Sequence, residues 1–80
     1  MAIYIYLRRI EQSETYSRYE FGTTAGAVGE LLIANDLSEY AITQIASDKS
    51  PTFFLPRCHR ALLKCYKSQG KLPNQAEYCA

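Results

Sequence analysis

Hydrophobic and polar residues alternate with a period of two in the N-terminal part of the chain. The segment 3–10 is rich in β-branched and aromatic residues, and the segment 15–21 repeats the pattern after a polar run. A period of two predicts half-buried β-strands, so both segments are interpreted as strands. Their predicted inward-facing residues are Ile3, Ile5, Leu7, Tyr19 and Phe21.

The numbering of these inward-facing residues predicts how the two strands pair. All five occupy odd positions. Residues paired across an antiparallel hairpin point to the same face, so odd positions must pair with odd positions. The loop around 11–14 must then contain an odd number of residues, and a three-residue loop fits.

The middle of the chain is the most ambiguous part of the pattern. We interpret the glycine-rich segment 22–29 as a flexible connection, followed by strands at about 30–35 and 39–46. A helix over 25–34 is the alternative, because Ala, Val, Glu and Leu all permit one. Two glycines inside that helix would cost about 1 kcal/mol each relative to alanine, which favours the strands.

The segment 54–69 has the periodicity of an amphipathic helix. Pro56 is expected in its first turn, where a missing N–H costs nothing, and Gly70 is expected to end it. Pro73 prevents the helix from continuing into the tail 70–80. The predicted apolar face consists of Phe54, Leu55, Cys58, Ala61, Leu62, Cys65 and Tyr66.

These elements predict an α+β fold for a single domain over residues 1–80. One helix with an apolar face and one sheet with an apolar face can cover each other. We therefore expect a four-stranded antiparallel β-meander with one C-terminal helix packed on one face. A chain of 80 residues has no room for two domains.

Composition narrows the function classes. The 9 basic and 8 acidic side chains give a net charge of +1, which argues against a strongly basic nucleic-acid binder or a strongly acidic nucleic-acid mimic. Three cysteines cannot form a complete disulfide framework. No segment has the pattern of a signal peptide or a membrane span, so we expect a reduced, cytoplasmic protein without a membrane partner.

The sequence gives little support for a metal site or a catalytic site. Cys58, His59, Cys65 and Cys79 are of the right types for zinc, but no Cys-x-x-Cys pair occurs. Cys58 and His59 are neighbours on the predicted helix and point about 100° apart, so they do not form a nucleophile–base pair. We expect no enzyme activity, no metal and no cofactor.

Two surfaces are candidates for binding a partner. The first is the outer face of the first two strands with the adjoining turn, where tyrosine and arginine are of the types enriched at interface hot spots. Its candidate residues are Tyr4, Tyr6, Arg8, Glu14, Tyr16, Arg18 and Glu20. The second is a basic stripe on the helix, which could follow a phosphate backbone or simply be a solvated face. It consists of Arg57, Arg60, Lys64, Lys67 and Lys71.

The layout of the chain resembles that of small immunity proteins of bacterial polymorphic toxin and contact-dependent growth inhibition systems. The resemblance lies in a tyrosine-rich first strand (IYIYLRRIE), the short patterns YEFG and GELLI, a basic helix, and a tail from GKLP to YCA. It implies a protein that binds a cognate toxin domain and blocks its active site or its access to substrate. The near-neutral charge departs from the acidic character common among immunity proteins against nucleases.

Charge is nevertheless unevenly distributed along the chain. Residues 1–50 carry four basic and seven acidic side chains, a net charge of −3, whereas residues 51–80 carry five basic and one acidic, a net charge of +4. The sheet half could thus face a basic toxin surface. Two alternatives remain open: a small nucleic-acid-binding or regulatory protein that uses the basic helix face, and a phage anti-defence inhibitor.

Overall fold

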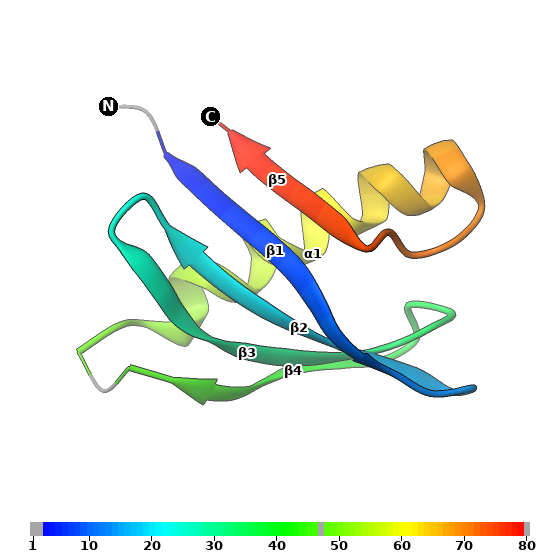
Figure 1. Cartoon of the computed structure of the whole chain (residues 1–80), viewed down its shortest axis with the longest axis horizontal. Coiled ribbons are helices and arrows are strands. Elements are labelled where there is room, and N and C mark those ends of the chain that lie inside the picture. Colours follow the sequence, from blue (N-terminus) through cyan, green and yellow to red (C-terminus); the bar gives the residue numbers. More distant parts are fainter. Residues whose placement is uncertain (1–2, 47, 80) are drawn as a thin grey trace.

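A computed structural model describes residues 3–46 and 48–79. One antiparallel sheet has the strand order β4-β3-β2-β1-β5, and a single helix lies across one of its faces (Figure 1). The α+β class and the C-terminal helix on one face are confirmed, but the sheet has five strands rather than four. The elements are β1 (Tyr4–Gln12), β2 (Tyr16–Thr23), β3 (Gly26–Ala34), β4 (Tyr40–Ile45), α1 (Pro51–Gln69) and β5 (Gln75–Cys79).

The pairing of β1 with β2 follows the predicted parity. Leu7 faces Phe21 and Arg9 faces Tyr19, so odd positions pair with odd positions. The register then shifts by one residue between Arg9 and Glu11, which makes a β-bulge at Ile10. The bulge, together with the short connection 13–15, brings the apolar residues of both strands to one face.

The glycine-rich segment is not the flexible connection that the pattern suggested. β2 and β3 run through it and leave only a short turn, so the alternative helix over 25–34 is also wrong. Glycine is needed here for close approach: a Cβ on Gly22 would lie 2.6 Å from the Tyr6 ring, and one on Gly29 would lie 2.2 Å from the Gln44 carbonyl oxygen. Both glycines thus let neighbouring groups pack onto strand backbone.

The helix begins at Pro51, three residues earlier than expected, with Ser50 as its N-cap residue. Proline suits this first position because its N–H would have no partner there. Pro56 therefore lies inside the helix rather than in its first turn. Gly70 ends the helix as predicted, with φ of 76° and its N–H donating to the Tyr66 carbonyl at 2.7 Å.

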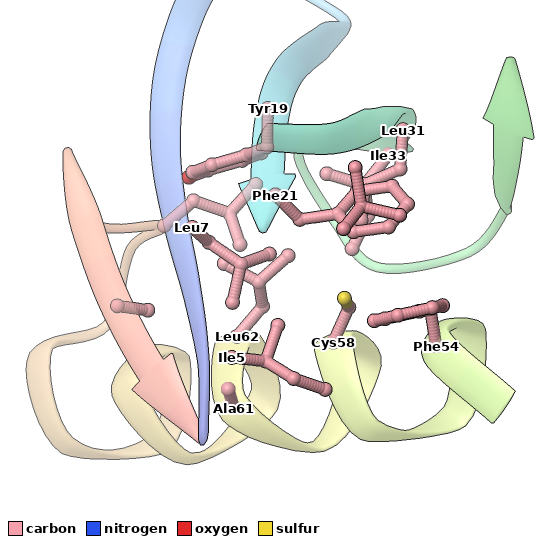
Figure 2. Packing of buried hydrophobic residues seen from close by; sticks show 13 residues of the cluster. Ile5, Leu7, Tyr19, Phe21, Leu31, Ile33, Phe54, Cys58, Ala61 and Leu62 are labelled. Atoms are coloured by element: carbon pink, nitrogen blue, oxygen red, sulfur yellow. The ribbon is translucent and has the colours of Figure 1, made fainter. Parts of the chain in front are cut away.

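A single hydrophobic core lies between α1 and the sheet (Figure 2). Side chains from the helix meet the inward residues of the strands, and Phe21 packs against Phe54 with ring centroids 5.3 Å apart. The fully buried large side chains include all the predicted strand residues except Ile3, which is partly buried. The core consists of Ile5, Leu7, Tyr19, Phe21, Val28, Leu31, Ile33, Phe54, Cys58, Ala61, Leu62, Leu72 and Ala76.

The tail forms the strand that the pattern did not predict. β5 pairs with the free edge of β1, with Tyr4 facing Cys79 and Arg8 facing Gln75 (Figure 1). Two side chains anchor the segment before it: the Tyr19 hydroxyl donates to the Pro73 carbonyl, and Arg9 Nη2 donates to the Leu72 carbonyl at 2.8 Å. In the described part of the chain, no helix has the length and hydropathy needed to cross a membrane.

Candidate functional site: the open face of the sheet

The sheet has one face that α1 does not cover, which we call the open face. Strand alternation places every second residue there, opposite the buried set. The pairing register brings the predicted strand residues together on this face, in neighbouring rows on β1 and β2. The open face includes Tyr4, Tyr6, Arg8, Tyr16, Arg18, Glu20, Glu30, Leu32, Ala34, Ala41, Glu77 and Cys79.

Tyrosine and charged groups interact with one another at the β1 end of the open face. The Tyr6 hydroxyl donates to Glu20 Oε1 at 3.3 Å, and Arg8 Nη2 donates to the same oxygen at 3.2 Å. Desolvation, with the nearby Glu20 carboxylate, raises the pKa of Tyr6 above its usual value. The phenol is therefore neutral at physiological pH and serves as a hydrogen-bond donor.

Arg18 lies between two carboxylates in the middle of the face. Its Nε is 3.2 Å from Glu11 Oε1, and its Nη1 is 3.6 Å from Glu30 Oε1. Exposed ion pairs of this kind contribute little to stability. The predicted charged residues Arg8, Arg18 and Glu20 are thus already paired within the chain.

The third region of the face lies where β2, β3 and β4 meet two turns. Tyr16 is half-buried here, and Glu14 lies in the β1–β2 connection rather than on a strand. These two predicted residues border a depression that also involves residues the sequence analysis did not single out. Its lining consists of Glu14, Thr15, Tyr16, Leu32, Ala34, Asn35, Asp36, Ser38, Glu39, Tyr40 and Ala41.

The basic stripe lies on the solvent side of α1, in the other layer of the molecule. Arg60, Lys64 and Lys67 are exposed, as is Lys71 just beyond the helix. Arg57 is half-buried: its guanidinium carbon lies 4.2 Å from the centroid of the Phe53 ring, and Nη1 donates to the Phe53 carbonyl at 2.9 Å. An aromatic ring therefore borders the stripe, at a position that the sequence analysis left outside the helix 54–69.

The cysteines and the histidine are not arranged as a reactive centre. Burial raises the pKa of the Cys58 thiol to about 12, so it is protonated and points into the core (Figure 2). His59 instead stacks on Tyr40, with ring centroids 4.1 Å apart. Among residues 3–46 and 48–79, no three His, Cys, Asp or Glu side chains are grouped as metal ligands.

No protein-family model matches the chain, and neither a curated protein nor a solved structure is significantly similar to it.

Proposed function

We propose that this chain is a cytoplasmic immunity protein that neutralises a bacterial toxin domain by stoichiometric binding through the open face. The single observation that supports this function is a five-stranded sheet covered by helix on one face only. The other face presents Tyr4, Tyr6 and Tyr16 partly exposed. Tyrosine supplies large contact area and a polar tip at protein interfaces.

Paired charges favour recognition of a protein over simple attraction of opposite charge. Arg8 pairs with Glu20 and Arg18 pairs with Glu11, so these charges are balanced within the chain around the tyrosines. A partner that replaces water over such a surface gains from shape and hydrogen bonding, whereas rim charges mainly speed association. Neutralisation then follows from steric blocking, without chemistry on either protein.

Growth rescue tests the function directly. Candidate toxin domains encoded beside this chain's gene are expressed from an inducible promoter in a sensitive host, with and without the chain. We expect growth to be restored and a one-to-one complex to elute in size-exclusion chromatography. Failure of every neighbouring candidate to be inhibited would refute the proposal.

A double alanine variant tests the choice of surface. Tyr6→Ala with Tyr16→Ala should weaken toxin binding by at least about tenfold, because truncation of interface hot-spot residues costs more than 1 kcal/mol each. Lys64→Ala with Lys67→Ala is the matched control on α1 and should bind like the parent. Unaltered affinity of the tyrosine variant would show that another surface binds the toxin.

Nucleic-acid binding through the basic stripe is the second candidate function. It is favoured by four exposed cations on and beside α1 that form no ion pair with the described carboxylates. Such binding should fall steeply with added salt. Fluorescence polarisation with labelled DNA and RNA oligonucleotides at low salt measures it, and absence of binding there excludes this function.

A further inference from the structure

The depression at the end of β2, β3 and β4 has an apolar floor and acidic walls. Its volume is about 890 Å³, and it opens onto the open face. Leu32, Ala34 and Ala41 contribute the strand part of its lining, beside Tyr16. Tyr40 borders the depression, but its ring lies on the helix side of the sheet, stacked on His59. Tyr40 is among the three large hydrophobic residues that are exposed in the described chain, at 41%.

The walls of the depression are held in place by one half-buried polar side chain, Asn35. Asn35 Nδ2 donates to the carbonyls of Ser13 and Glu14 at 2.9 and 3.1 Å, and the fully buried Ser17 donates to Asn35 Oδ1 at 2.8 Å. The Asn35 backbone N–H donates to the Thr15 carbonyl at 3.0 Å. The β1–β2 connection and the β3–β4 turn are therefore tied together, so the depression exists before any partner arrives.

Three carboxylates line the depression, and none of its lining residues is basic. Glu14, Asp36 and Glu39 form no ion pair with the described cations, in contrast to the paired Glu11, Glu20 and Glu30 on the same sheet. Hydrogen bonding from the Ser38 side chain, together with the Ser38 N–H that donates to Asp36 Oδ1 at 2.9 Å, lowers the pKa of Asp36 and keeps it ionised. The depression thus carries negative charge that is not balanced within the chain.

We infer that this depression receives an arginine side chain of the partner protein. Arginine is the residue that matches all three features, because its planar guanidinium stacks on tyrosine rings, pairs with carboxylates and is weakly hydrated. Lysine offers a point charge without the stacking. This inference rests on the proposed function and names the anchor that the toxin contributes: a projecting arginine seated between the Tyr16 ring and the acidic walls.

A peptide titration tests the inference without the toxin. The isotope-labelled chain is titrated with an acetylated and amidated Gly-Arg-Gly-Arg-Gly peptide while backbone amide signals are followed by NMR. We expect saturable shifts confined to the β1–β2 connection, the β3–β4 turn and the start of β4. The same peptide with citrulline in place of arginine keeps the shape but lacks the charge, and it should produce no saturable shift.

Charge-removing variants identify the residues responsible. Glu14→Gln, Asp36→Asn and Glu39→Gln together should weaken the peptide about tenfold, as expected for three exposed ion pairs. Asn at position 36 can still accept the hydrogen bond from Ser38, which preserves the turn. Asp48→Asn with Glu77→Gln lowers the acidic charge elsewhere and should leave peptide binding unchanged.

The outcomes separate this inference from the proposed function. Shifts at other sites, equal effects of the two peptides, or unchanged binding by the triple variant would each overturn the arginine anchor, even if growth rescue succeeds. Localised, charge-dependent shifts would support the anchor even if no neighbouring toxin is inhibited. In that case the proposed function fails while the depression remains a site for a basic partner protein.

Discussion

The hydrogen bond from Tyr19 to the tail is the sharpest test of how β5 is held. Tyr19 is 0% exposed, and Pro73, whose carbonyl accepts a hydrogen bond from the Tyr19 hydroxyl, is also buried. Water cannot replace the hydroxyl there, so Tyr19→Phe leaves the carbonyl without a partner. A buried group left unsatisfied costs about 1–3 kcal/mol.

That cost is large for a chain of this size. Domains are stable by roughly 0.05–0.15 kcal/mol per residue, which corresponds to about 4–12 kcal/mol here. A loss of 1 kcal/mol lowers the melting temperature of such a domain by about 4–8 °C. We therefore expect Tyr19→Phe to lower the melting temperature by at least about 4 °C, and to speed hydrogen exchange most strongly at the amides of β5.

Thermal unfolding and native-state hydrogen exchange measure these two effects, and urea unfolding gives the free energy that is lost. Tyr78→Phe is the matched control: Tyr78 lies in β5 itself, but its hydroxyl forms no hydrogen bond with another described residue. If Tyr19→Phe loses less than about 0.5 kcal/mol, or if both variants behave alike, the reasoning about this anchor is wrong.

Three further perturbations probe other parts of the molecule. Gly29→Ala should destabilise the fold by about 1–3 kcal/mol in urea unfolding, since its Cβ would meet the Gln44 carbonyl oxygen at 2.2 Å; a neutral result contradicts the β3–β4 packing. Asn35→Ala should lower the free energy of unfolding by about 1–3 kcal/mol in the same assay, because the buried Ser17 hydroxyl loses its hydrogen-bond acceptor. An unchanged free energy would show that water replaces the amide. The Cys58 pKa is raised from 9.0 to about 12, so its contribution to stability is complete below pH 9 and is lost as pH rises toward 12, by at most about 1.4 kcal/mol per pH unit. Between pH 8 and 10.5, the melting temperature should therefore fall less steeply with pH for Cys58→Ala than for the parent chain. Equal pH dependence of the two melting temperatures would refute ionisation of Cys58 as the cause.

Local patterns were sufficient for the first two strands and for the helix face. Alternation in β1 and β2 placed Ile5, Leu7, Tyr19 and Phe21 in the core, where all four are buried. The pattern failed at β5 because only Ala76 and Tyr78 alternate there, and Pro73 suggested an unstructured tail. What makes that segment a strand is the unpaired edge of β1, a partner far away in sequence.

Two prolines near the start of α1, Pro51 and Pro56, could each have occupied its first turn. The sequence analysis used Pro56 as the first-turn residue, but Pro51 takes that position. Pro56 then removes only the N–H that would bond the Thr52 carbonyl, close to the helix start, where the carbonyl is exposed to water. The longer helix also brings Phe54 into the core, where it is buried.

The candidate site was accessible from the sequence only in part. Parity placed Tyr4, Tyr6 and Tyr16 on one face, as the pairing register requires. It could not show that Arg8 and Arg18 are paired, nor that Asp36, Glu39 and Tyr40 lie beside Tyr16. Those residues come together because Asn35 joins two turns that are far apart in sequence, and asparagine in a turn carries no signal for such a role.

The pairing of β1 with β5 also dictates the order of events while the protein is synthesised. Strands β1 to β4 follow one another with short connections, so they can associate as the chain leaves the ribosome. One edge of β1 stays unpaired until residues 75–79 emerge, because its partner β5 follows α1 in the chain. Ribosomes that stall or terminate within α1 would thus release chains with an open β1 edge, a template for aggregation. Pairing of β5 with β1 is therefore the step that closes this edge against association with other copies of the chain.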